Sequence, residues 1–252
     1  MGARLGKAEE DVEEETMVKR GSNIPGKSLM NFGNKTLMVN KGTNRFSKHQ
    51  KVRNQFQATI NTNMKNSNYK NLVMCPVGED RLEWLCLHAF IFYDIVENVF
   101  EICQDEHLCD DVNCPLMSAG KFTFLWADSY SEQYKTPRNV PASQYIYLAL
   151  DWIFITITNE EVFPQEGDII ETKKGEKVLD RVYKLLFRIW AHLYLAHYVQ
   201  IQRIGADAVF SSGFKHFITF IVRNQVLKLE QMEPLSTIIT DVLRITLENK
   251  NG

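Results

Sequence analysis

The sequence predicts an all-α fold, a helical bundle with one small β-hairpin and, if its paired cysteines and histidines bind zinc, a zinc-stapled loop. Three observations lead to this prediction. Apolar residues recur every three or four positions over most of residues 80–247, as on one face of a helix. Residues 109–138 instead combine Pro and Gly with alternating aromatics, which indicates loop and hairpin. Two cysteines and two histidines stand at spacings that metal sites use.

Length and composition predict one domain and a tail. The chain has 252 residues, of which 44% are hydrophobic and 24% charged. No segment resembles a signal peptide, and the longest apolar stretch, 148–157, is interrupted by Asp151 and is far shorter than the ~20 residues that span a bilayer. Five cysteines without a secretion signal indicate a reducing compartment. We therefore expect a cytoplasmic or nuclear protein with no membrane insertion.

Charge divides the chain into three blocks. Residues 1–15 hold six acidic and two basic residues (−4), 16–78 hold eleven basic and no acidic residues (+11), and 79–252 hold 25 acidic and 16 basic residues (−9), which sum to the net −2. Residues 1–70 are also polar and aperiodic, apart from one short amphipathic helix expected near 46–60. The expected organisation is a flexible, charge-partitioned arm over 1–70 and a zinc-binding helical domain over 71–252.

The first core helix is expected to begin at Asp80. Asp80 and Glu83 have the spacing of a capping box, with Asp in place of Ser or Thr. Apolar residues follow at helical spacing: Leu82, Leu85, Phe92, Val96 and Phe100.

The remaining elements follow in order. The alternating Phe122, Phe124 and Trp126 predict the hairpin. Pro141 is expected to open a second helix that ends near 158, because proline favours the first helical turn. Further helices are expected over 176–204, 212–227 and 234–247.

The candidate metal ligands are Cys109, Cys114, His192 and His197. Two thiolates and two imidazoles satisfy a tetrahedral zinc ion, and four protein ligands leave no position for a reactive water, so such a zinc is structural. On an ideal helix the two histidines are separated by roughly 140°, so the helix must bend or end between them. The spacing fits equally well an alternative in which the cysteines are buried thiols and the histidines belong to the core.

Longer strings resemble a known family. CPVGEDRLEW (75–84), CPLMSAG (114–120), WAD (126–128), LFRIWAH (186–192) and FKHF (214–217) occur in the order seen in the Mob (Mps one binder) kinase co-activator family. The resemblance covers about 72–240 and is closer to the Hippo-type, NDR/LATS-activating branch than to phocein. It implies that Cys109, Cys114, His192 and His197 hold one structural zinc ion per chain.

The resemblance also implies a non-catalytic adaptor. Mob proteins bind the basic region N-terminal to the catalytic domain of NDR/LATS-type AGC kinases, and Glu79, Asp80, Glu83 and Trp84 match the motif that contributes to that surface. The −9 balance of residues 79–252 has the complementary sign. The alternative is that Asp80 and Glu83 only cap a helix while Trp84 packs in the core.

A second implied site is a basic pocket for phosphothreonine peptides from MST/Hippo-type kinases or phosphorylated scaffolds. Lys184 and Arg188 match it and lie four residues apart on one helix. Lys135 matches in the loop before Pro137. Two positions depart from the family's basic pattern: Leu185 and Thr136. A weaker pocket is expected, and the alternative is a pair of solvated cations.

Other classes of function fit less well. A zinc hydrolase needs an open coordination position and a general base. Glu106 and Asp110, near the cysteines in sequence, are candidate bases, but nothing else supports chemistry. Nucleic-acid binding by the basic arm fits less well, because the arm has few aromatic residues and the body is acidic. A zinc-stabilised scaffold or an inhibitory Mob protein with other partners remains the alternative.

Overall fold

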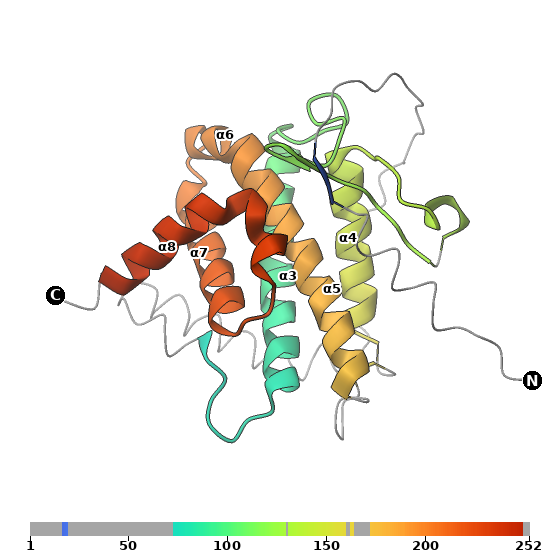
Figure 1. Ribbon diagram of the computed structural model, residues 1–252. Helices are drawn as coiled ribbons and strands as arrows, with labels where there is room; N and C mark the ends of the chain where they lie inside the picture. Colours follow the sequence, from blue (N-terminus) through green and yellow to red (C-terminus); the bar gives the residue numbers. More distant parts are fainter. Residues whose placement is uncertain (1–16, 20–72, 130, 160–161, 164–171, 249–252) are drawn as a thin grey trace, which may run out of the picture.

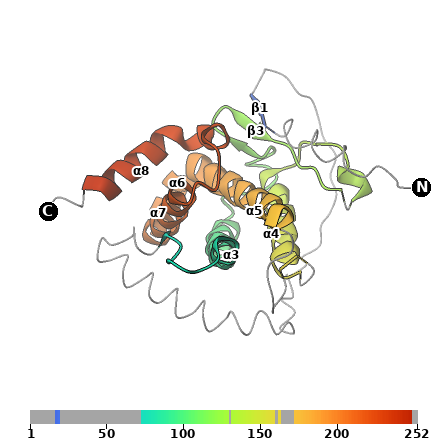
Figure 2. The ribbon, with the colours of Figure 1, turned by 60° about the horizontal axis from the view of Figure 1, so that its bottom comes forward.

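The computed structural model describes residues 17–19, 73–129, 131–159, 162–163 and 172–248. Its centre is the long helix α3 (Arg81–Asp105), which packs against α4 (Ala142–Ile157), α5 (Thr172–His192) and α7 (Asp207–Arg223) (Figure 1). Figure 2 looks almost along α3 and shows α4, α5 and α7 around it. The predicted helical bundle is confirmed.

Helix α3 begins where the sequence places its cap. One oxygen of the Asp80 carboxylate, Oδ1, accepts hydrogen bonds from the backbone N–H of Leu82 at 2.8 Å and of Glu83 at 2.9 Å. These bonds satisfy two of the donors that a helix N-terminus leaves unpaired. The predicted apolar positions of α3 are all buried, and so is the unbroken run from His88 to Tyr93, because α3 is surrounded by other helices.

Aromatic side chains fill the space between α3, α5 and α7. The ring of Phe92 lies 5.1 Å from that of Phe217 and 5.2 Å from that of Phe220, both in edge-on arrangements. Trp190, which is fully buried, packs in the same way on Phe210 at 5.2 Å. Edge-to-face packing of this kind contributes about 0.5–1.5 kcal/mol per pair beyond area burial.

The predicted hairpin consists of β2 (Ser118–Ala119) and β3 (Phe122–Phe124), paired antiparallel. Gly120 lies in the turn with φ of 57°, a conformation that glycine adopts without strain. A further strand, β1 (Met17–Lys19), pairs with the other edge of β3, so the strand order is β1-β3-β2. Strand β1 belongs to the predicted arm. The rest of the arm, including the helix expected near 46–60, lies outside the described residues.

The expected helix over 176–204 is interrupted. Helix α5 begins earlier, at Thr172, and is followed by a π-helical turn, η3 (Leu193–His197), and by α6 (Tyr198–Arg203). A π-helix has more residues per turn than an α-helix, which rotates His197 back toward His192. The bend predicted between the two histidines is confirmed, and the π-turn is its form.

The last helices differ from prediction in their limits. Helix α7 was expected over 212–227 but spans Asp207–Arg223. Gly205 (φ 75°) separates α6 from α7, so α7 begins earlier than expected. Gln225 (φ 50°) leaves the helical conformation, so α7 ends before it. A 3-10 turn, η4 (Leu229–Leu235), leads into α8 (Ser236–Glu248), close to the predicted 234–247. Among the described residues, none of the helices combines the length and the hydropathy that crossing a bilayer requires.

Candidate metal centre and flanking charged surfaces

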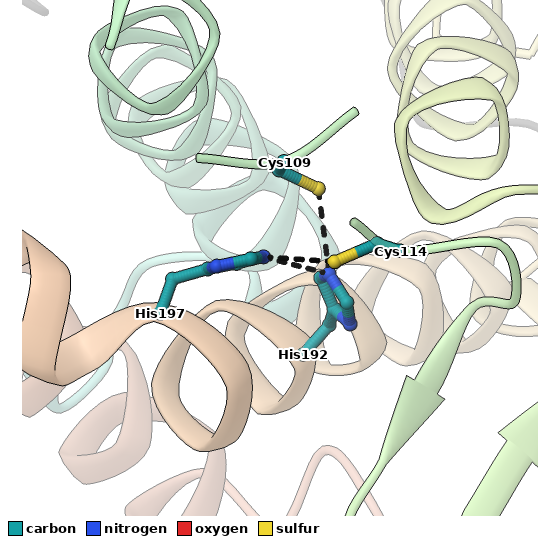
Figure 3. A group of neighbouring side chains, drawn as sticks. All are labelled: Cys109, Cys114, His192 and His197. Atoms are coloured by element: carbon teal, nitrogen blue, oxygen red, sulfur yellow. Dashed lines mark hydrogen bonds between the residues drawn. The ribbon is translucent and has the colours of Figure 1, made fainter. Parts of the chain in front are cut away.

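The four predicted metal ligands converge on one point. Cys109 and Cys114 come from the loop after α3, His192 ends α5, and His197 ends η3; all four are buried (Figure 3). Their ligand atoms lie within 4.8 Å of one another. Residues separated by about eighty positions in the sequence are therefore brought together, as the family resemblance implied.

The distances fit a tetrahedral ion. The Cys109 Sγ and His192 Nε2 atoms are 3.4 Å apart, as are Cys114 Sγ and His197 Nε2, and the two Nε2 atoms are 3.2 Å apart. Zinc bonds of ~2.3 Å to sulfur and ~2.0–2.1 Å to nitrogen at tetrahedral angles place S and N about 3.5 Å apart and two N atoms about 3.3 Å apart. The donor set and its size both suit zinc.

Neighbouring groups orient the ligands. The Nδ1 atom of His192 lies 2.7 Å from the Ser118 carbonyl oxygen, which can only accept, so Nδ1 carries the proton and the lone pair of Nε2 faces the cluster. The backbone of Cys114 is held on both sides: its N–H donates to the Asp110 carbonyl at 2.9 Å, and its carbonyl accepts from Ala142 at 2.9 Å. The β-hairpin and α4 thus position the site.

The Cys109 and Cys114 thiols differ in acidity. The hydrogen bond from Cys109 lowers the pKa of the Cys114 thiol, and the same bond, together with burial, raises the pKa of Cys109. One thiolate is therefore favoured before any metal binds, and thiolates are the form that binds metal. The other cysteines lie apart: Cys86 and Cys103 are buried in the core, and Cys75 is half-buried near the start of α3.

The four predicted kinase-binding residues gather at the start of α3. Glu79, Asp80 and Glu83 are exposed. Trp84 is half-buried, its Nε1 donates to the Val73 carbonyl at 3.2 Å, and it packs against the core. Asp80 therefore caps the helix and Trp84 packs, as the structural alternative required, while the exposed carboxylates remain on the surface.

The predicted phosphopeptide residues occupy two segments. Lys184 and Arg188 lie one turn apart on α5, and each has a partner: Lys184 pairs with Asp180 at 2.6 Å, and Arg188 donates to the Tyr145 hydroxyl at 3.0 Å. Lys135 follows the short 3-10 turn η2 (Glu132–Tyr134) and pairs with Glu132.

Sequence reasoning missed one cation of this group. Arg181 lies three residues before Lys184, donates to the Ala127 carbonyl at 2.9 Å and covers the ring of Trp152. Its spacing of three and seven residues from Lys184 and Arg188 was a visible signal. We call Arg181, Lys184 and Arg188 the basic stripe.

Comparison with known proteins gives one consistent family. The chain is 32% identical to human MOB kinase activator 3B over 196 residues, covering 77% of this chain and 85% of that protein. It is 30% identical to MOB kinase activator-like 3 of Drosophila melanogaster over 81% of this chain and 88% of that protein. It is 29% identical to MOB kinase activator-like 1 homolog B of Dictyostelium discoideum over 84% and 94% of the two chains.

The Mob1/phocein family model matches residues 61–235, a span that includes the whole metal centre and the start of α3. Members of this family are kinase activators and adaptors and are not enzymes themselves. The family predicted from the sequence strings is thereby confirmed: the chain belongs to the Mob1/phocein family.

Proposed function

We propose that this protein is a non-catalytic adaptor and co-activator that binds the basic N-terminal regulatory region of an NDR/LATS-type AGC kinase. The observation that carries the proposal is the exposed acidic group at the start of α3, Glu79, Asp80 and Glu83, in a chain whose relatives are named kinase activators. Residues 79–252 carry a charge balance of −9, which attracts a basic partner over long range. Such attraction mainly speeds and orients docking.

One structural zinc ion per chain is part of the proposal. Cys109, Cys114, His192 and His197 would hold it, and it would cross-link the loop after α3 to the end of α5. The tetrahedral distances and the orientation of His192 by Ser118 support zinc. Four protein ligands make the role structural.

Binding of phosphothreonine peptides is the second proposed activity. The basic stripe and Lys135 supply the cations, and an MST/Hippo-type kinase or a phosphorylated scaffold would supply the phosphate. Leu185 stands where the family pattern has a basic residue; its apolar side chain adds no charge to the pocket and is buried in the core. The half-buried Lys184 and Arg188 are already partnered, and phosphate would have to displace or share Asp180.

The alternative is a scaffold or inhibitory Mob protein that uses the same acidic surface for another partner. For the co-activator and for this alternative alike, we propose a location in the cytoplasm or nucleus.

Charge reversal at Glu83 tests the kinase proposal. Recombinant basic N-terminal segments of NDR-type and LATS-type kinases would be titrated against the wild-type chain, Glu83→Lys and the matched control Glu101→Lys, which is exposed on the same helix. We expect Glu83→Lys to weaken binding about tenfold at low salt, equivalent to ~1.4 kcal/mol, and the control to bind nearly as the wild type does. Circular dichroism checks that both variants fold. Equal binding by wild type and Glu83→Lys would show that the surface is wrong.

A further inference from the structure

We propose that Thr136 is a phosphorylation site for a proline-directed protein kinase, and that its phosphate weakens the phosphopeptide pocket; the second half rests on the function proposed above. Pro137 follows Thr136, and no other proline in the sequence follows a serine or threonine. Proline-directed kinases select a proline directly after the acceptor residue. The chain therefore offers one motif of this kind.

The fold presents Thr136 on a turn whose two ends are fixed. At one end Tyr134 is buried, and its hydroxyl accepts a hydrogen bond from Gln144 Nε2 at 3.0 Å. At the other end the backbone N–H and C=O groups of Arg138 both pair with Trp126 at 2.9 Å. Thr136 lies exposed between these anchors. A residue before proline prefers the extended backbone, which is the conformation that kinases bind in their substrates.

The hydroxyl is available for transfer. None of the residues that the structure describes hydrogen-bonds the Thr136 side chain. In the reaction, the bond between the γ-phosphorus of ATP and the β,γ-bridging oxygen breaks and a bond to Thr136 Oγ1 forms. The kinase's base takes the hydroxyl proton, and ADP leaves. The modification thus removes no interaction that holds the described fold together.

The phosphate would reverse the charge of the turn. Residues 131–139 contain one acidic and two basic side chains, a balance of +1. Lys135, which directly precedes Thr136, already pairs with Glu132. A phosphate adds about −1.5 to −2, which leaves the turn at about −0.5 to −1.

This change occurs beside the basic stripe. The segment that pairs with Arg138 continues into Ala127, whose carbonyl accepts from Arg181, the first residue of the stripe. Phosphate on Thr136 would therefore lower the positive potential that a phosphothreonine peptide meets. Local phosphorylation and peptide binding should oppose each other.

The first test is chemical. The full chain would be incubated with ATP and a purified proline-directed kinase, and the modified residue identified by mass spectrometry, beside the variants Thr136→Val and Pro137→Ala. We expect one phosphate on Thr136, none at that position in Thr136→Val, and a several-fold slower reaction in Pro137→Ala. No phosphate on Thr136, under conditions in which the kinase modifies a standard substrate peptide, would overturn the proposal. An equal rate in Pro137→Ala would overturn the assignment to this kinase class.

The second test is binding. A library of phosphothreonine peptides, with its unphosphorylated counterpart as control, would be offered to the unmodified chain, the phosphorylated chain and Thr136→Glu. We expect several-fold weaker binding after phosphorylation, an intermediate effect of Thr136→Glu, and smaller differences at high salt because salt screens exposed charges. Equal affinities would overturn the regulatory half. If the unmodified chain binds no phosphothreonine peptide, the pocket proposal fails and the regulatory half with it, while the mass measurement still decides whether Thr136 is a site.

Discussion

His192 combines two roles in one side chain. Its Nδ1 atom is bound to the Ser118 carbonyl, and its Nε2 atom lies within 3.4 Å of both Cys109 Sγ and His197 Nε2. A ring with both nitrogens engaged has its orientation fixed, which prepares the cluster to receive an ion without rearrangement. The neighbouring thiolate of Cys114 adds the negative charge that a dication requires.

Loss of a ligand should release the metal. Cys114→Ala or His197→Ala is expected to bind no zinc. Because structural zinc contributes folding energy, each variant should also melt about 8–16 °C lower, for a loss of ~4 kcal/mol at roughly 2–4 °C per kcal/mol. Metal analysis and thermal unfolding measure the two effects. Cys75→Ala, which removes a half-buried thiol outside the cluster, is the control and should keep its zinc. Purified wild-type protein without zinc, and with unchanged stability after chelation, would contradict the proposal.

The identities of the candidate ligands followed from the sequence, but the partners of the charged residues followed only in part. Asp180 stands four residues before Lys184, so their ion pair was predictable from helical spacing. The bonds from Arg188 to Tyr145 and from Arg181 to Ala127 join separate elements, and no local pattern specifies them. The packing of Trp84 on the core likewise depends on how α3 is oriented.

At the scale of helices, Gly213 sets how closely three of them approach. A Cβ atom at this position of α7 would lie 2.5 Å from Ile95 Cγ2 on α3 and 3.2 Å from Trp190 Cη2 on α5. The distance to Ile95 Cγ2 is shorter than non-bonded carbon atoms adopt in folded proteins. Glycine is therefore required by packing, although its backbone is ordinary helix.

Gly213→Ala should destabilise the fold. Replacing glycine by alanine in a helix normally stabilises the helix by about 1 kcal/mol, but overpacking of this kind costs about 1–3 kcal/mol. We therefore expect the free energy of unfolding, measured with urea, to fall. In an Ile95→Ala background the clash with Cγ2 disappears, and the same substitution should be less harmful. Equal losses in both backgrounds would show that Ile95 does not limit the approach.

The limits of the helices show where local signals mislead. The spacing of the two histidines correctly required a bend after His192, because an α-helix cannot bring residues five apart to one side. The predicted limits of α7 were wrong by several residues. Gln225 adopts a positive φ, which is not expected from its residue type, and Gly205 ends α6 although the apolar pattern continues past it. Both outcomes depend on tertiary packing.

Across the whole molecule, two buried histidines connect stability to pH. His88 on α3 and His216 on α7 have ring centres 6.0 Å apart, and His88 also stacks on Phe220 at 4.1 Å. The pKa of each histidine is lowered to about 3, by burial for His216 and by burial together with the nearby His216 for His88. The folded protein thus keeps both rings neutral where an unfolded chain would protonate them near pH 6.5.

Stability should therefore fall on acidification. Because the folded pKa values are depressed, the unfolded state binds more protons between pH 6.5 and 3, and each histidine lowers the free energy of unfolding by up to about 1.4 kcal/mol per pH unit in that window. Urea unfolding at pH 7.5, 6.5 and 5.5 measures the slope. In His216→Phe, which keeps an aromatic ring but cannot titrate, the slope should be smaller. An unchanged slope would assign the effect to other groups, such as the metal ligands, which both proteins share.

The placement of Trp190 gives the molecule a built-in optical reporter. Of the four tryptophans, Trp126 and Trp190 are buried, whereas Trp84 and Trp152 are half-buried. The Trp190 ring is fully buried against the rings of Phe210 and Phe214, so it lies in an apolar environment that shifts its fluorescence to short wavelengths. It also lies two residues before His192. Any event that loosens the end of α5 should move its emission toward that of a hydrated indole, so opening of this end can be followed in real time without an added label.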